Sequence, residues 1–192
     1  MRVVLATGNP GKVSEFEALW PDAEVAGAPD GFGPEETGAT FFQNAWIKAS
    51  ALRDRAAPED LVVADDSGLV VHALGGRPGV FSARYAGADA SDDDNCRRLL
   101  QELEGVAERR AAFMCVLVAL APDDRMLVAA GCCPGVIAPA MRGGRGFGYD
   151  PLFVPEGHAR SMAEMTRDEK AAISHRGRAA RRMSSLMGLV PA

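Results

Sequence analysis

The residues with the clearest chemical potential lie in a glycine-rich segment, GGRGFGYDP, at positions 143–151. Four glycines within six residues allow the backbone to come close to a flat ligand. Phe147 offers a stacking surface and Asp150 a carboxylate, and His175 and Arg176 follow downstream. Together these groups could stack on a nucleobase and hydrogen-bond its edge. A tight turn that packs Phe147 in the core is the alternative, because Gly, Asp and Pro all favour turns.

A second glycine-containing loop, Thr7–Lys12, has the sequence TGNPGK and follows a short apolar run, Val3–Ala6. At a strand-to-helix junction of this kind, unsatisfied backbone N–H groups and the positive end of the helix favour an anion. Lys12 adds a full positive charge. The loop differs from the G-x-x-x-x-G-K-[ST] phosphate loop, because its glycines are three apart and Val13 follows the lysine. It suits a phosphate, although a strand, turn and helix without a ligand would produce the same pattern.

The third feature is a pair of carboxylates, Asp65 and Asp66, directly after the apolar run Leu61–Ala64. Carboxylates at the end of a strand can hold Mg²⁺ through oxygen and orient a water molecule. Two turn residues before Gly68 are the alternative. An aspartic protease would need a second Asp-Ser-Gly triplet, which the chain lacks, or a symmetric dimer. The D-x-D pattern of dehalogenase-type phosphatases fails at Ser67.

Charged residues elsewhere could complete such a site. Glu35 and Glu36 precede an expected helix and could supply a magnesium ligand or simply compensate the helix dipole. Lys48, about two turns into that helix, could reach a phosphate or extend its ammonium into water. Lys170 is close in sequence to the His175–Arg176 pair. These three donors could contact a ligand or form a solvated basic face.

Hydrophobic periodicity predicts an α/β fold with a mixed sheet in one compact unit. Ser91 is expected to cap a helix whose first turn contains three aspartates, and residues 122–124 are expected at the turn of a hairpin. The expected strands are Val3–Ala6, Leu61–Ala64, Leu69–Val71, Ala111–Ala121 and Met126–Ala130, the last continuing toward Ile137. The expected helices are Lys12–Leu19, Thr40–Arg55, Ser161–Glu164, Arg167–Ile173 and Arg176–Met187.

Bulk composition limits the possible functions. For a chain of 192 residues we expect a single domain, 1–192. A net charge of -5 and an aromatic content of 6% disfavour a general nucleic-acid binder or RNA-binding module. No apolar run approaches the roughly 20 residues of a membrane span. The four cysteines show no metal-ligand spacing and no disulfide framework, so we expect a cytoplasmic protein.

Taken together, stretches of this chain resemble the inosine/xanthosine triphosphate pyrophosphatase family, whose members hydrolyse aberrant purine nucleoside triphosphates. Any one stretch is a weak signal, but they occur in the family's order and span nearly the whole chain. The matching stretches are TGNPGK at 7–12, EETGATF at 35–41, NA at 44–45, KA at 48–49, ADDSGL at 64–69, LGGRPGV at 74–80, SARY at 82–85, GFGYDP at 146–151, EK at 169–170 and SHR at 174–176.

The resemblance implies a single elongated α/β domain, with a mixed sheet flanked by helices, two lobes around a nucleotide-binding cleft, and usually a homodimer. It also implies Mg²⁺-dependent cleavage between the α- and β-phosphates of ITP, dITP or XTP, giving the nucleoside monophosphate and pyrophosphate. The partner is then a small-molecule purine nucleoside triphosphate, with no nucleic acid and no membrane. A non-catalytic nucleotide-binding or sensing protein is the alternative.

The resemblance also implies roles for individual residues. Asp66 is the catalytic carboxylate and a magnesium ligand, Glu36 is a further ligand, and Phe147 stacks on the base. The other residues implied to bind substrate are Thr7, Gly8, Asn9, Pro10, Gly11, Lys12, Ser67, Gly148, Tyr149, Asp150, Lys170, His175 and Arg176, with assistance from Lys48. Of these, the loop at 7–12 and Lys170 hold the triphosphate. The chain departs from the family pattern at His72 and Cys132–Cys133, outside these sites.

Overall fold

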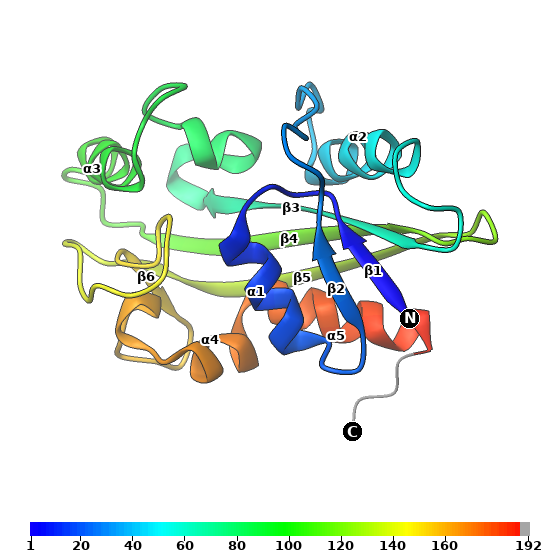
Figure 1. Ribbon diagram of the computed structural model, residues 1–192. Coiled ribbons are helices and arrows are strands. Elements are labelled where there is room, and N and C mark those ends of the chain that lie inside the picture. Colours follow the sequence, from blue (N-terminus) through cyan, green and yellow to red (C-terminus); the bar gives the residue numbers. More distant parts are fainter. Residues whose placement is uncertain (189–192) are drawn as a thin grey trace. The chain divides into compact units, whose positions relative to one another are not determined.

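The computed structural model describes residues 1–188 (Figure 1). Its elements, in chain order, are β1 (Arg2–Leu5), α1 (Pro10–Leu19), β2 (Glu24–Gly27), α2 (Phe41–Arg53), β3 (Leu61–Val71), two 3₁₀ helices (His72–Leu74 and Gly79–Arg84), α3 (Asp92–Glu102), β4 (Arg110–Leu120), β5 (Met126–Ile137), β6 (Phe153–Pro155), a third 3₁₀ helix (Met162–Glu164), α4 (Arg167–Ile173) and α5 (His175–Met187).

The strands form one sheet in the order β2-β1-β3-β4-β5-β6. β1 runs parallel to both β2 and β3, whereas β6 runs antiparallel to β5. β4 and β5 are neighbours joined by residues 121–125, at the place where the sequence predicts a hairpin. The mixed α/β sheet that the sequence predicts is therefore confirmed.

The described chain packs into two compact units that are interleaved in sequence. Unit 1 comprises Met1–Asp66, Cys115–Gly131 and the residues from Arg176 onward. Unit 2 comprises Ser67–Met114 and Cys132–His175. The long strands β3, β4 and β5 contribute residues to both units.

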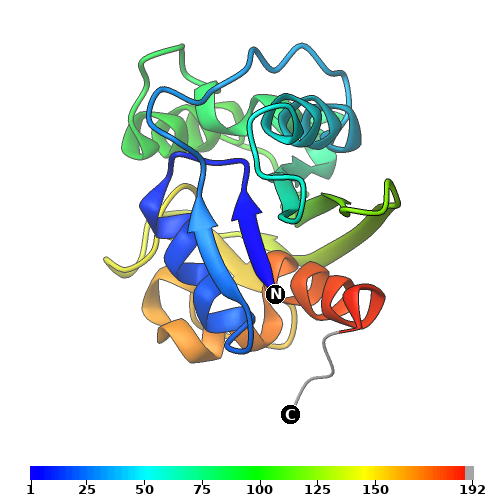
Figure 2. The same cartoon turned by 45° about the vertical axis from the view of Figure 1, so that its right-hand side comes forward.

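Unit 1 has helices on both faces of its strands. Alternate residues of a strand point to opposite faces, and β1 shows this directly. Val3 and Leu5 belong to a core cluster with α1 and α5, whereas Val4 and Ala6 belong to a separate cluster with α2. In both views α2 (cyan) lies toward the top and α5 (red) toward the bottom (Figure 1, Figure 2), and the two core clusters place them on opposite faces of β1. Buried on both faces, Val3–Leu5 of β1 is accordingly a continuous apolar run that follows the exposed Arg2.

Unit 2 has its own core, built around α3. The apolar spacing of Cys96, Leu99, Leu100 and Leu103 predicts the buried face of this helix. Cys96, Leu99 and Leu103 are fully buried in this core, and Leu100 is partly buried against it. Ser91 caps α3 as predicted, because its side chain accepts a hydrogen bond from Asp94 N and its backbone N–H donates to the Asp94 carboxylate. This reciprocal pattern is a capping box.

One predicted break is wrong. Asp65 and Asp66 lie within the continuous strand β3, rather than between two strands. Both aspartates are buried, with residue exposures of 5% and 6%. Buried carboxylates are tolerated inside a strand when cations compensate them, and both aspartates have such partners in unit 1. β3 therefore continues through Gly68 without a turn.

Several smaller expectations are corrected at element ends. α2 begins at Phe41, with Thr40 as its cap, and ends at Arg53 rather than Arg55. The short helix expected at 161–164 is a single 3₁₀ turn. The four cysteines form no disulfide in the described residues. None of the described helices is both long and apolar enough to span a membrane.

Candidate functional site

The loop between β1 and α1 is ordered by its own side chains. Asn9 caps α1, accepting hydrogen bonds from Gly11 N at 2.8 Å and Lys12 N at 3.3 Å. Thr7 Oγ1 accepts a hydrogen bond from Asn9 N at 3.1 Å. Pro10 begins the helix, where its missing N–H costs nothing. The strand, turn and helix expected from the sequence are thus present, and the loop is exposed from Gly8 to Gly11.

On one face of β3, Asp65 connects the end of this loop to α5. Its Oδ1 accepts a hydrogen bond from Lys12 Nζ at 2.8 Å. Its Oδ2 accepts from Arg176 Nε at 3.3 Å and Nη2 at 3.1 Å, and Arg176 Nη1 donates to Glu15 of α1 at 2.6 Å. Burial alone would raise the pKa of Asp65, but the charges of Lys12, Arg176 and Lys48 outweigh it and hold this pKa far below its usual range.

On the opposite face of β3, Asp66 faces α2. Lys48 Nζ donates to Asp66 Oδ1 at 2.8 Å and to Glu36 Oε1 at 2.9 Å. Asn44 Nδ2 donates more weakly to Asp66 Oδ2, at 3.4 Å. Burial raises the pKa of Asp66, and the negative charges of Glu36 and Asp65 raise it further against the opposing effect of Lys48.

A close backbone approach fixes the position of Asn44. Gly38 N donates to Asn44 Oδ1 at 2.8 Å. A Cβ on Gly38 would lie 2.6 Å from that same oxygen and 2.9 Å from Asn44 N, so a larger residue would push Asn44 away. The Gly38 backbone therefore holds Asn44 beside Asp66.

Glu36 and Asp66 fit the donor set of a magnesium ion. Their oxygens converge on one point, which the Lys48 ammonium occupies. Residues 1–188 contain no group of three or more His, Cys, Asp or Glu side chains arranged to hold a metal. Mg²⁺ commonly takes one or two carboxylates and completes its shell with water and substrate phosphates. Glu35, the alternative ligand, is exposed.

In unit 2, the glycine-rich segment is organised by Asp150. Its Oδ2 accepts hydrogen bonds from Phe147 N at 3.0 Å and from Lys170 Nζ at 2.6 Å. The Lys170 ammonium lies 4.5 Å from the centroid of the Phe147 ring. Gly146 has a φ of 79°, and a Cβ there would overlap the Asp150 carboxylate. Phe147 is 44% exposed, so the expectation that it packs in the core is excluded.

The neighbours of Phe147 have different surroundings. Gly148 N donates to Asp92 at 2.7 Å. Tyr149 is buried, and its hydroxyl donates to Ser82 O at 2.9 Å, so its ring belongs to the core of unit 2. His175 is also buried and stacks on Phe113, with 4.7 Å between ring centroids.

The three donors that lie close together in sequence, Lys170, His175 and Arg176, belong to different units. Lys170 and His175 belong to unit 2, while Arg176 belongs to unit 1 and pairs there with Asp65 and Glu15. Ser67 is a partly exposed residue of β3. The contacts of these residues with a substrate remain predictions.

Comparison with known proteins identifies the family. The model of the Ham1 family matches residues 3–186. The chain belongs to the Ham1 family.

Ham1 relatives are similar over nearly their whole length. A dITP/XTP pyrophosphatase of Staphylococcus epidermidis is 48% identical over 183 residues, covering 93% of this chain and 92% of the relative. A dITP/XTP pyrophosphatase of Yersinia pseudotuberculosis is 50% identical, covering 95% of each. The solved Staphylococcus aureus Ham1 protein superposes with a TM-score of 0.88 at 39% identity, covering 98% of each chain.

Two members of this Ham1 site were missed or left without a role by sequence reasoning. Glu15 follows Lys12 by three residues, which places both side chains on one face of α1, and this spacing could have revealed it. Asn44 was recognised as part of a matching stretch but given no role.

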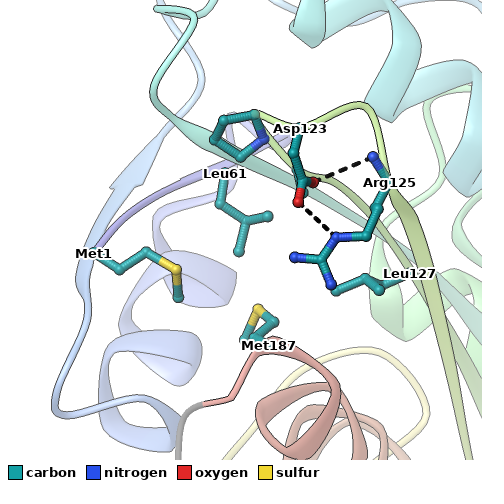
Figure 3. A pocket seen from close by; sticks show the side chains of 8 residues that line it. Met1, Leu61, Asp123, Arg125, Leu127 and Met187 are labelled. Atoms are coloured by element: carbon teal, nitrogen blue, oxygen red, sulfur yellow. Dashed lines mark hydrogen bonds and ion pairs between the residues drawn. The ribbon is translucent and has the colours of Figure 1, made fainter.

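A hollow elsewhere in unit 1 of the Ham1 chain has different chemistry (Figure 3). This cavity of about 260 Å³ is lined by Met1, Leu61, Ala121, Pro122, Asp123, Arg125, Leu127 and Met187. Its charged members neutralise each other, because Arg125 Nε donates to Asp123 at 2.7 Å. The hollow contains no residue of the predicted site and offers no set of cations for a triphosphate.

Proposed function

We propose that this chain hydrolyses non-standard purine nucleoside triphosphates, such as ITP, dITP and XTP, to the monophosphate and pyrophosphate with Mg²⁺. The single observation that best supports this proposal is the convergence of Glu36 and Asp66 on one cationic point, the Lys48 ammonium. The Ham1 relatives named as dITP/XTP pyrophosphatases support the same reaction.

In this proposal unit 1 binds the phosphates. The exposed Thr7–Lys12 loop and the Lys12 ammonium contact the distal phosphates, with assistance from Lys48. Lys170 is the further lysine that the family resemblance implies for the triphosphate. Glu36 and Asp66 would hold Mg²⁺, which supplies positive charge against the negative charge that develops on the leaving phosphates. The lysine ammonium groups are already in position before the reaction begins, so they stabilise this charge without rearrangement.

Asp66 orients the attacking water and accepts its proton. A carboxylate with a raised pKa is a better proton acceptor than an ordinary aspartate. Water oxygen forms a bond to the α-phosphorus, the bond from that phosphorus to the bridging oxygen breaks, and pyrophosphate leaves as one group. The non-catalytic alternative requires the same binding residues without this step.

Unit 2 selects the base. Phe147 stacks on the purine, and the loop of Gly148, Tyr149 and Asp150, with His175, contacts its edge. A pocket of hydrogen-bond donors accepts the 6-keto oxygen of hypoxanthine or xanthine. It opposes the 6-amino group of adenine, leaving buried donors unpaired at about 1–3 kcal/mol each.

A substrate panel tests the proposal. ITP, dITP, XTP and ATP are incubated with Mg²⁺ or with EDTA, and pyrophosphate and orthophosphate are scored separately. We expect pyrophosphate from the first three, loss of activity in EDTA, and kcat/KM for ATP lower by roughly 10²–10⁴-fold, as for two donor mismatches. Production of IDP and orthophosphate would contradict α–β cleavage. Binding of ITP without pyrophosphate release would favour the sensing alternative.

The assembly and location of the protein remain part of the proposal. Resemblance to the pyrophosphatase family supports a cytoplasmic homodimer. Sedimentation of the purified chain should give twice the mass of 20.2 kDa, and a monomer at all concentrations would contradict the dimer.

A further inference from the structure

We propose that Asp65 is a positioning residue, which fixes Lys12 and Arg176 so that the phosphate loop is held in its binding orientation. This role of Asp65 rests on the proposed function, in which Lys12 contacts the triphosphate and Asp66 activates water. The two aspartates are neighbours in sequence but face different helices, and they therefore have separate tasks.

The two oxygens of Asp65 are divided between two partners. Oδ1 accepts from Lys12 at 2.8 Å, and Oδ2 accepts both Arg176 contacts, at 3.1 and 3.3 Å. The Asp65 side chain is 3% exposed. A carboxylate held from both ends in a buried position is fixed in one orientation, and it has little access to a reacting water.

Arg176 extends the connection back to α1. Its guanidinium is fully buried and bridges Asp65 of β3 and Glu15 of α1. Lys12 and Glu15 are both on α1, within one turn of each other and of the phosphate loop. Asp65 is therefore connected to α1 in two ways, directly through Lys12 and indirectly through Arg176 and Glu15. The first turn of α1 is thereby fixed relative to β3.

Lys12 is the member of this network that can reach a ligand. Its side chain is 21% exposed, whereas the side chain of Arg176 is 2% exposed. Asp65 acts on the substrate through Lys12, and its loss should weaken phosphate binding rather than slow the chemical step.

Steady-state kinetics of Asp65→Asn and Asp66→Asn separate the two tasks. Asn keeps the shape of Asp65 but removes the charge that pairs with both cations. For Asp65→Asn we expect KM for ITP and the Kd of pyrophosphate, measured by calorimetry, to rise about tenfold, with kcat changed less than about threefold. For Asp66→Asn we expect the reverse, with kcat lost and pyrophosphate binding retained.

A double-mutant cycle with Lys12→Met distinguishes positioning from a general structural role. If Asp65 acts through Lys12, the double variant should have nearly the same pyrophosphate Kd as Lys12→Met alone. Asp65→Glu keeps the charge and should recover part of the affinity. If Asp65→Asn does not fold, Arg176→Lys provides the test, because it keeps the charge but loses the two-point contact with Asp65, and the same rise in KM is expected.

Three results would overturn the proposal. A loss of kcat in Asp65→Asn as large as in Asp66→Asn would make Asp65 part of the chemical step. Tighter pyrophosphate binding would mean that Asp65 competes with phosphate for Lys12. Additive effects in the cycle would remove the link to Lys12. These results are distinguishable from failure of the proposed function, because in that case the wild-type chain would release no pyrophosphate from ITP.

Discussion

The charged cluster of unit 1 and the aromatic loop of unit 2 are built in opposite ways. In unit 1, Lys12, Lys48 and Arg176 each pair with a carboxylate, and both aspartates are nearly buried. In unit 2, Phe147 is 44% exposed on a loop with a left-handed glycine, and one carboxylate, Asp150, organises it.

The difference follows from what each cluster is proposed to bind. Phosphates and a metal require charges that are already in position, and buried charges are tolerated only as compensated pairs. A purine requires an accessible ring face for stacking. Changes in unit 1 should therefore affect turnover, cation binding and phosphate affinity, whereas changes in unit 2 should affect the binding and choice of the base.

The largest effect is expected at Asp66. Asp66→Asn removes the proton acceptor while keeping the hydrogen bond from Lys48 possible, so kcat for ITP should fall by roughly 10²–10⁴-fold. The rate of pyrophosphate release at saturating ITP measures kcat, and circular dichroism shows whether the variant is folded. Glu35→Gln is the control, since it removes a nearby exposed acid. Near-normal turnover in a folded Asp66→Asn protein would remove Asp66 from the mechanism.

A smaller effect is expected at Phe147. Phe147→Ala removes the stacking surface, and loss of one stacked base costs about 1–3 kcal/mol, or roughly 5–150-fold in kcat/KM for ITP. Pyrophosphate binding should stay unchanged, because the phosphates belong to the other cluster. Phe81→Ala is a matched control in the same unit, since Phe81 is 56% exposed and also has a cation, Arg84, over its ring. Equal losses in both variants would contradict a specific stacking role.

The third prediction concerns the ammonium shared by Glu36 and Asp66. Lys48→Met keeps the length of the side chain and removes its charge, leaving the two carboxylates to attract a cation more strongly. We expect the substrate-free protein to bind Mn²⁺ up to about tenfold more tightly, as measured by electron paramagnetic resonance. Lys12→Met, which removes a cation from the other face of β3, should have a weaker effect. Unchanged Mn²⁺ affinity in Lys48→Met would indicate that metal and ammonium do not compete.

The smallest effect is expected in the protection of one thiol in each core. Cys115 is buried in unit 1 and Cys96 in unit 2, and burial raises the pKa of both thiols, that of Cys96 to about 12. Each reacts with a thiol reagent only when its surroundings open. In a Cys132→Ser background, pyrophosphate with Mg²⁺ should slow labelling of Cys115 more than Cys96, by about tenfold at ligand ten times above Kd. Inosine should instead slow the labelling of Cys96 more than that of Cys115. Equal protection by both ligands would mean that the two cores open together.

The sequence predicts what depends on local signals. Ser91 is predicted as a helix cap, and it caps α3. The helix expected from Lys12 is also present, although it begins earlier, at Pro10, after the Asn9 cap. The predicted break at residues 65–68 is wrong, because the turn-forming sequence DDSG was given more weight than the apolar residues on either side of it. With β3 recognised as continuous, period-two alternation alone would have placed Asp65 and Asp66 on opposite faces.

Pairings between distant segments could not be predicted in this way. No local pattern indicates that Arg176 meets Asp65, since the contact depends on how α5 packs against β3 and α1. The same holds for Glu36 and Asp66, which meet through Lys48 on a third element. Motif resemblance grouped Arg176 with His175, yet consecutive residues of α5 belong to different units.

The separation of Asp65 and Arg176 by 111 positions also affects how the protein is made. During translation, α1 and β3 leave the ribosome long before α5. Until α5 emerges, the guanidinium that pairs with Asp65 is missing, and so is the carbonyl of Ala180 that accepts the Trp20 indole N–H at 3.2 Å. Unit 1 therefore completes its packing only after α5 has been synthesised. Until then, the nascent chain exposes an unfinished core to chaperones and proteases.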